Sequence, residues 1–385
     1  MAISNRIGPP VTGDDFYGRQ KELSIALNDL STRHSLLLSA PRRVGKSSLA
    51  MKIIEEEKAA GWKCVYIDLE GISTQNKFLS VLIDSLDTSG IFKLAATSIG
   101  SAIGEIARSI KSIGSFKIDF ATLCPEKDLY YLLSEAIDHN EDTLIVIDEL
   151  PLFLSIISRE EGDDFQVRFL LNWFRSLRQV PNTKVRWIFC GSVGLANFTS
   201  MRNLSSTIND LKDLEIGEMS DEEATGLVSA LATSSNLNLT EECINHIILG
   251  LQWNLPYFIQ LIINSLKQST PNIISFDDID AVIDDMSRSR HLSSWAERMS
   301  EYGEYEDIAM EILKIMSSIP NGLTKQQLIP IISENFSHLK PSMLDTKLSK
   351  TLGMLEHDGY IIRKGPVRLF RSPLIRKWWF NNFVE

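Results

Sequence analysis

The clearest structural signal in this chain of 385 residues is Ser35-Leu36-Leu37-Leu38-Ser39-Ala40-Pro41-Arg42-Arg43-Val44-Gly45-Lys46-Ser47-Ser48. Its apolar half predicts a buried strand, and its Gly-Lys-Ser predicts a tight turn that opens a helix. This order matches the phosphate-binding pattern G-x-x-x-x-G-K-[ST], with Ala40 in the place of the first glycine. A solvated basic turn before a helix is the alternative interpretation.

Each part of such a loop has a role toward a nucleotide. Its backbone N–H groups face the β-phosphate, and the helix that follows adds its positive N-terminal end. Lys46 is expected to reach the β- and γ-phosphates, and the Ser47 hydroxyl is expected to hold Mg²⁺. The candidate nucleotide-binding residues here are Ala40, Pro41, Arg42, Arg43, Val44, Gly45, Lys46, Ser47 and Ser48.

Composition places the chain among ordinary globular proteins. Hydrophobic residues make up 44% and charged residues 23% of the sequence, and the four cysteines are widely spaced. Widely spaced cysteines are typical of a reducing compartment, and no apolar run is long enough to span a membrane. We therefore expect a cytoplasmic protein without a membrane span.

Four apolar segments predict strands, namely 35–39, 63–69, 143–149 and 185–192. They alternate with helical patterns, so we expect an α/β fold with a parallel sheet covered on both faces. The helical patterns lie at 16–30, 47–61, 76–86, 127–139 and 166–179.

The second half of the chain differs in pattern. From residue 220 to about 315 the periodicity is helical, with a capping box at Ser220 and Glu223. The end of the chain predicts a helix after Thr324, a helix at 343–356 and a hairpin at 359–370, which is the order of a winged helix-turn-helix. The expected domains are a P-loop domain at 1–214, a helical lid at 215–300 and a winged helix at 301–385.

Paired acids follow the third predicted strand. Asp148 and Glu149 come directly after four apolar residues, and ligands of parallel sheets bind at the carboxyl ends of strands. Asp148 is expected to bind Mg²⁺, mostly through water, and Glu149 to act as general base toward the attacking water. Ser192 ends the fourth strand, where a polar side chain can orient that water. The alternatives are a solvated turn or helix N-terminus for the two acids and an ordinary strand-end serine.

Several motifs together resemble a known family. They occur at Phe16–Leu23, Ala40–Leu49, Leu144–Glu149, Cys190–Ser192, Ile216–Ala224, Leu255–Tyr257 and Phe370–Trp379. With these pieces the chain resembles an AAA+-type P-loop ATPase of the archaeal ATPase-like group, close to the STAND switch ATPases. The two arginines of the phosphate loop and the Ser-Pro-Leu at residues 372–374 are the most specific points of likeness.

The resemblance implies further site residues. Tyr17 and Gly18 would lie by the adenine, Ser192 would sense the γ-phosphate, and Pro256 and Tyr257 of the lid would lie near the base. The plain alternatives are a packing role before the first helix for Tyr17 and a core role for Tyr257.

Arginines that act on the γ-phosphate are not evident. The sequence lacks a clear lid arginine, and no arginine finger can be assigned. Arg168, Arg175 and Arg178 on the predicted helix at 166–179 are at least as well explained as a solvated face. This departure from the family favours a slow nucleotide switch over a ring motor.

Charge is unevenly distributed along the chain. The net charge is −11, yet residues 321–385 hold ten basic and five acidic residues. Two interpretations stay open for this excess, either DNA contact or only protein packing. The residues concerned are Arg363, Lys364, Arg368 and Arg371.

Together these observations predict a Mg²⁺-dependent ATPase that binds ATP and ADP and hydrolyses ATP slowly. Its nucleotide is expected to control a switch that acts on a partner protein, a homo-oligomer or a DNA assembly. The resemblance adds defence or mobile-element biology as a setting for such a switch. The alternative is a nucleotide-stabilised DNA-binding or scaffold protein with negligible hydrolysis.

Overall fold

The computed structural model describes residues 3–91, 130, 133–161, 164–191, 194–269 and 274–384. It divides into two compact units. Residues 19–39 and 46–216 form the first, which we call the sheet unit. Residues 1–18, 40–45 and 217–385 form the second, which we call the helical unit. The division into three domains remains a prediction.

A five-stranded sheet organises the sheet unit. Its strands are β1 (Leu36–Ser39), β2 (Lys63–Asp68), β3 (Thr143–Asp148), β4 (Val185–Gly191) and β5 (Lys212–Glu215). They are all parallel, in the order β2-β3-β4-β1-β5. Every residue of β3 and β4 is buried, as expected for central strands covered on both faces. The four predicted strands and the parallel α/β fold are therefore confirmed, whereas β5 was not predicted.

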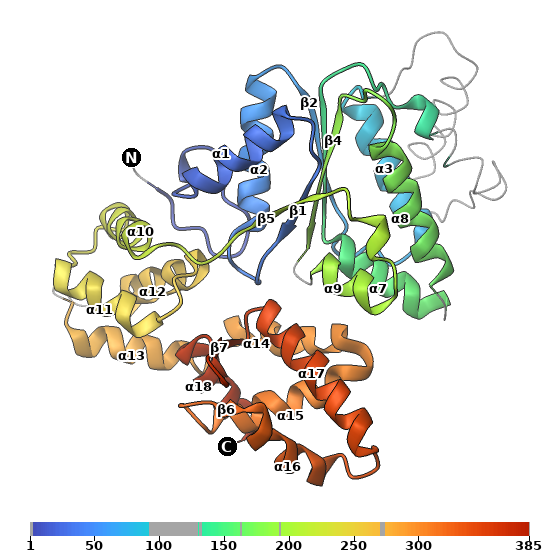
Figure 1. The fold of residues 1–385 in the computed structure, drawn as a ribbon. Coiled ribbons are helices and arrows are strands. Elements are labelled where there is room, and N and C mark those ends of the chain that lie inside the picture. The colour runs from blue at the N-terminus through green and yellow to red at the C-terminus, as the bar shows by residue number, and fades with distance from the viewer. Residues whose placement is uncertain are drawn as a thin grey trace. The chain divides into compact units, whose positions relative to one another are not determined.

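Helices cover both faces of this sheet. Figure 1 shows α1 and α2 on one side of it and α3 and α8 on the other. Aromatic rings fill the core on the α3 and α8 side, where Phe78 stacks on Phe153 and Trp187 stacks on Phe189. Of the helix expected at 127–139, residues 130 and 133–136 are helical, residues 137–139 are not, and the rest lie outside the described residues. Within the described residues, the sheet unit contains the helices α1 (Gln20–Ser31), α2 (Lys46–Ala59), α3 (Gln75–Thr88), α7 (Leu150–Glu161), α8 (Phe165–Arg178) and α9 (Leu195–Met201).

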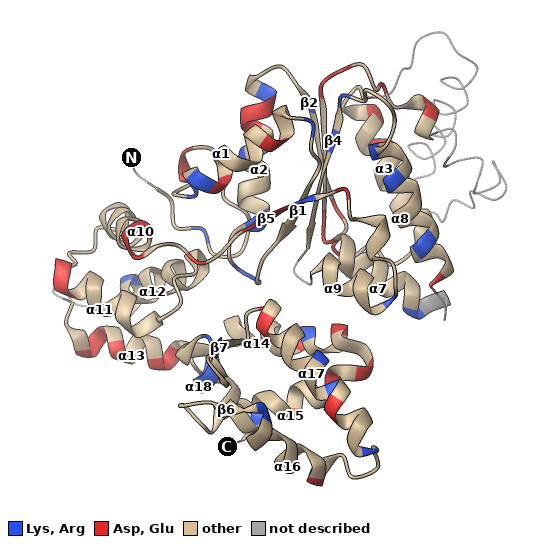
Figure 2. Cartoon of the chain, in the orientation of Figure 1, with Lys and Arg blue, Asp and Glu red and all other residues tan. Residues whose placement is uncertain are grey.

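The helical unit contains a group of four helices after residue 220. They are α10 (Asp221–Ser234), α11 (Glu241–Leu251), α12 (Pro256–Ser269) and α13 (Phe276–Met286). The capping box predicted at Ser220 and Glu223 is present, and the Glu223 amide donates to Ser220 Oγ over 3.1 Å. Figure 2 shows acidic residues along α13, which begins with a second capping box at Ser275.

The last part of the helical unit is a winged-helix arrangement. It is preceded by α14 (Ser293–Glu297), the 3-10 helix η4 (Arg298–Tyr305) and α15 (Glu306–Ser317). Its elements are β6 (Leu323–Thr324), α16 (Lys325–Asn335), α17 (Pro341–His357), β7 (Ile361–Lys364), β8 (Val367–Phe370) and α18 (Pro373–Phe383). Strands β6, β8 and β7 form an antiparallel sheet, in that order. The predicted succession of helix, helix and hairpin is thus confirmed.

Within the described ranges, no helix is both long enough and apolar enough to span a membrane.

Candidate functional site

The predicted phosphate loop joins a strand to a helix. Strand β1 ends at Ser39, helix α2 begins at Lys46, and residues 40–45 connect them. Arg43 and Gly45 both have left-handed backbones, with φ of 66° and 99°. Glycine adopts this conformation readily, whereas an arginine there costs on the order of 1–3 kcal/mol. The loop therefore stores backbone strain at Arg43, two residues before the glycine of the motif.

The start of α2 meets the end of β3 within the sheet unit. Ser47 Oγ donates a hydrogen bond of 2.7 Å to Asp148 Oδ2, although the two residues are 101 positions apart. Lys46 and Asp148 are both buried. The hydroxyl and the carboxylate expected to share a magnesium ion are thus in direct contact.

Two more groups hold the Asp148 carboxylate. Tyr66 of β2 donates from its hydroxyl to Asp148 Oδ2 over 2.6 Å, and the Glu149 amide donates to Asp148 Oδ1 over 2.9 Å. Burial raises the pKa of Tyr66 above its ordinary value, and the Asp148 carboxylate raises it further. Tyr66 therefore stays protonated and acts as a donor. Its part in this network was not predicted from the sequence.

Glu149 lies at the turn between β3 and α7. Its φ of 54° is left-handed, which is strained for a glutamate, and its side chain is half-buried. Asp68, at the end of β2, is the register partner of Asp148. Partial burial raises the pKa of Asp68, and the Asp148 and Glu149 carboxylates raise it too. The charges of three acids thus act on one edge of the sheet, and a cation bound there would relieve their repulsion.

This donor set fits magnesium. Mg²⁺ is usually held by one or two carboxylates together with nucleotide phosphates and water, rather than by a cage of protein ligands. Asp148 and Ser47 offer a carboxylate and a hydroxyl side by side. Among the residues that the structure describes, no cluster of three or more His, Cys, Asp or Glu side chains is arranged to hold a metal ion by itself.

The tip of the loop packs within the helical unit. The Arg43 guanidinium carbon lies 4.3 Å from the centroid of the Tyr257 ring, near the start of α12. Arg42 donates from Nη1 to the Ser294 carbonyl of α14 over 2.8 Å. These contacts connect both loop arginines to the region after residue 217.

Pro41 makes a third contact of this kind. Gly359 has φ of 82°, and a Cβ built on it would lie 2.8 Å from Pro41 Cβ. A side chain at position 359 would therefore be strained and would also collide with the loop. The contacts made by Ser294 and Gly359 were not predicted, because packing partners distant in sequence leave no local pattern.

The predicted adenine residues lie within the helical unit. Tyr17 packs against α10, where a Cβ at Gly226 would collide with its hydroxyl. Gly18 lies against Met219 and Glu223. Pro256 begins α12, and the neighbouring Tyr257 is buried beneath Arg43.

Solved structures share this architecture. The Walker-type ATPase PABY2304 of Pyrococcus abyssi is similar with a TM-score of 0.65 and 15% identity, over 97% of this chain and 99% of that one. The ORC2 protein of Aeropyrum pernix, solved as ADPNP–ADP complexes, is similar with a TM-score of 0.55 and 14% identity, over 98% of this chain and 95% of that one. The chain has the fold of an AAA+-like P-loop ATPase. Neither a protein-family model nor a curated protein matches it.

One predicted member of the P-loop site stays a prediction. Ser192 and the residue after it lie outside the described ranges, directly after the end of β4. The role of Ser192 toward the attacking water therefore rests on its position in the sequence alone.

The three arginines of α8 differ in their contacts. Arg178 forms a bidentate pair with Asp210, through Nε and Nη2 at 2.8 Å each. Arg175 donates to the Ser206 carbonyl. Arg168 is exposed. Arg175 and Arg178 thus bind the segment that precedes β5. The sequence alone leaves open that they form a solvated face of the helix.

The four basic residues of the winged helix differ in their surroundings. Arg363 and Lys364 are exposed at the hairpin, whereas Arg368 donates from Nε to Glu356 Oε1 over 2.6 Å. Arg371 lies over the Trp253 ring, with its guanidinium carbon 5.1 Å from the centroid, and its Nη2 is 3.8 Å from a Glu218 oxygen. Two of the four candidate DNA-binding residues, Arg368 and Arg371, therefore already make contacts within the protein.

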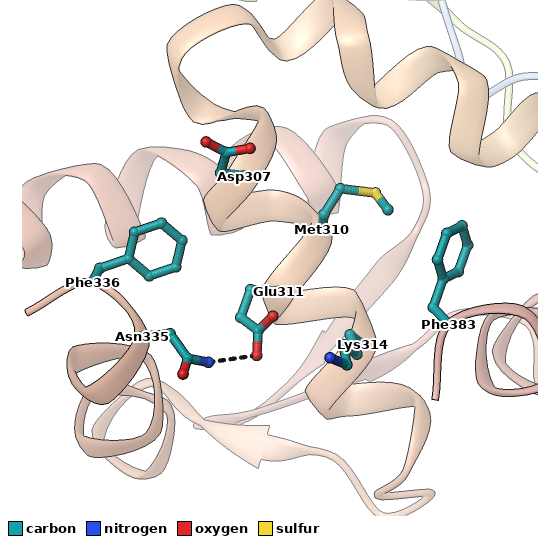
Figure 3. A pocket seen from close by; sticks show the side chains of 7 residues that line it. All are labelled: Asp307, Met310, Glu311, Lys314, Asn335, Phe336 and Phe383. Carbon is teal, nitrogen blue, oxygen red and sulfur yellow. Dashed lines mark hydrogen bonds between the residues drawn. The ribbon is translucent and has the colours of Figure 1, made fainter. Parts of the chain in front are cut away.

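A separate pocket of about 450 Å³ lies in the winged-helix region (Figure 3). It is formed by α15 and by residues at the ends of α16 and α18, and Asn335 Nδ2 donates across it to Glu311 Oε1 over 2.7 Å. None of the predicted nucleotide-site residues lines it; its lining is Asp307, Met310, Glu311, Lys314, Asn335, Phe336 and Phe383.

Proposed function

We propose that the chain binds ATP with Mg²⁺ and hydrolyses it. The observation that carries this proposal is the hydrogen bond from Ser47 to Asp148, which joins the start of α2 to the end of β3. When bound, Mg²⁺ would neutralise charge on the phosphates. Ser47 and Asp148 would hold it, and Lys46 would bind the β- and γ-phosphate oxygens.

Glu149 is the proposed general base. It directly follows Asp148, the proposed metal ligand, and its left-handed backbone lies where the chain leaves the sheet. A half-buried carboxylate at this edge can take a proton from the attacking water. Ser192 is the proposed residue that orients this water. The test is magnesium-dependent phosphate release by the whole chain, compared with the chain carrying Glu149→Gln.

The adenine is proposed to bind among Tyr17, Gly18, Pro256 and Tyr257. All four belong to the helical unit, together with loop residues 40–45. The phosphates would then contact the backbone of residues 40–48.

We further propose that the nucleotide works as a switch of the STAND kind, acting on a partner protein or a homo-oligomer. The support is the set of contacts made by Pro41, Arg42 and Arg43 with regions after residue 217. Phosphates bound by the loop would change the conformation that the loop prefers. Loop contacts that differ between two nucleotide states would bias the lid and the winged helix.

Removing the Arg43–Tyr257 contact is expected to weaken this coupling. A cation–π contact is worth about 0.5–2 kcal/mol, so Arg43→Ala should raise amide hydrogen exchange at the start of α12 by about 2- to 30-fold before ATP is added. ATP should then change that exchange less than it does in the wild type. Hydrogen–deuterium exchange measured by mass spectrometry, with and without ATP, checks both effects.

Arg202→Ala is the matched control for this experiment. The Arg202 guanidinium carbon lies 4.0 Å from the centroid of the Phe198 ring, a cation–π contact within the sheet unit. Its removal should leave exchange in α12 unchanged. Equal exchange in α12 for Arg43→Ala and wild type, in both nucleotide states, would contradict the switch.

DNA contact is a second candidate function, favoured by the exposure of Arg363 and Lys364 at the hairpin. Binding to duplex DNA weakens with salt in proportion to the number of phosphates that the protein contacts. The double substitution Arg363→Glu with Lys364→Glu should therefore weaken duplex binding and reduce the log–log salt slope by about two. A salt titration of binding measures both effects.

Lys21→Glu with Lys77→Glu is the control of equal charge for the hairpin variant. It reverses two exposed lysines of the sheet unit and leaves the winged helix unchanged. Equal binding by both double variants across the salt titration would exclude the hairpin as the site of DNA contact.

A further inference from the structure

The Asp148 carboxylate accepts hydrogen bonds on both of its oxygens. Its Oδ2 accepts from Ser47 Oγ at 2.7 Å and from the Tyr66 hydroxyl at 2.6 Å, and its Oδ1 accepts from the Glu149 amide at 2.9 Å. Tyr66 reaches it from the neighbouring strand. Since Tyr66 is the register partner of Val146, two positions before Asp148, the contact runs diagonally between β2 and β3.

The two hydroxyls that donate to Asp148 Oδ2 have different roles. A serine that ligates Mg²⁺ gives a lone pair to the metal, so its orientation is set partly by that ion. Tyr66 is not in the phosphate loop, and its single O–H points at the carboxylate. A hydrogen bond from Tyr66 fixes the plane of the Asp148 carboxylate and selects which lone pairs remain for a metal-bound water.

We infer that Tyr66 is a positioning residue for the magnesium site, holding the Asp148 carboxylate ready for metal-bound water before and after the nucleotide binds. The inference rests on the proposed function, since it assigns a task within the same site. Three observations support it. Tyr66 and Ser47 donate to the same oxygen of Asp148, the hydrogen bond from the Tyr66 hydroxyl is 2.6 Å long, and Tyr66 belongs to strand β2 of the sheet.

Tyr66→Phe tests the inference because it removes the hydroxyl and keeps the ring. The quantity to measure is the strengthening of nucleotide binding by Mg²⁺, obtained as the ratio of Kd values for a non-hydrolysable ATP analogue in EDTA and in Mg²⁺. We expect this ratio to fall about tenfold, the lower end of the effects of removing a residue behind a metal ligand. The Kd in EDTA should stay within about twofold, because Tyr66 is assigned no phosphate contact.

Tyr130→Phe is the matched control. It removes a buried tyrosine hydroxyl in the same unit, one that accepts from Gln75 Nε2 at 2.9 Å, and it should leave the ratio unchanged. Tyr66→Leu should lower the ratio as Tyr66→Phe does, because both lack the hydroxyl.

Two results would overturn the inference, namely a wild-type ratio in Tyr66→Phe or an equally weakened affinity in EDTA and in Mg²⁺. If the wild type itself binds the analogue equally with and without Mg²⁺, the proposed function fails as well. The two failures are therefore distinguishable in one set of titrations.

Discussion

Replacing Glu149 with glutamine should reduce magnesium-dependent ATP hydrolysis by roughly 10²- to 10⁴-fold, the usual contribution of a general base. Glutamine keeps the size of the side chain and its place after β3 but cannot accept a proton from water. ATP binding should persist, since Glu149 is not assigned to the phosphates or the metal. Phosphate release under saturating ATP and Mg²⁺ gives the rate, and equilibrium binding of ATP gives the affinity.

Glu70→Gln is the control for this substitution. Glu70 follows the end of β2 and is exposed, and its charge acts on Asp68, so this change removes a carboxylate near the same edge of the sheet. Its effect on hydrolysis should stay within about twofold, as is usual for surface substitutions. Wild-type hydrolysis no faster than that of Glu149→Gln, with and without DNA, would leave the nucleotide-stabilised scaffold as the better explanation.

Most of the sheet could be predicted from its apolar runs. Residues 144–147 are entirely apolar and entirely buried, because a central parallel strand faces helices on both sides. Strand β5 has the sequence Lys212-Asp213-Leu214-Glu215, and only Leu214 is buried. At the edge of a sheet the backbone pairs with one neighbour, here β1, and polar side chains remain in solvent. Hydrophobic periodicity therefore carries no signal for this strand.

The contact between Ser47 and Asp148 follows from a rule about strands. Both residues lie at or soon after the carboxyl end of a parallel strand, and such ends meet at one edge of the sheet. Tyr66 lies before the end of β2, inside an apolar strand, where it looks like any aromatic residue of a core. Only the order of the strands, which places β2 beside β3, brings its hydroxyl to Asp148.

The second large effect is expected from Lys46→Ala, which should remove most of the stabilisation of the protein by ATP. A ligand at 100 times its Kd stabilises the folded state by about 2.7 kcal/mol, and weaker binding removes this gain. Lys46 is buried at the start of α2, where it is assigned to the β- and γ-phosphates, so its removal should weaken ATP binding by at least about 100-fold, as for a buried charged partner. The measurement is the ATP-induced shift in the midpoint of thermal unfolding. Each variant is compared with itself, because removal of a buried lysine also alters the stability of the ligand-free chain.

Lys52→Ala separates the phosphate role from a general effect of charge on α2. Lys52 lies on the same helix and pairs with Glu55 at 3.3 Å and Glu56 at 2.7 Å. Its removal changes the net charge as Lys46→Ala does, but surface pairs of this kind contribute about 0–1 kcal/mol. The ATP-induced shift should therefore be kept in Lys52→Ala and largely lost in Lys46→Ala. A shift of equal size in Lys46→Ala and wild type would mean that nucleotide, if bound, does not bind at this loop. The assignment of Asp148, Glu149 and Tyr66 to its chemistry would then fall with it.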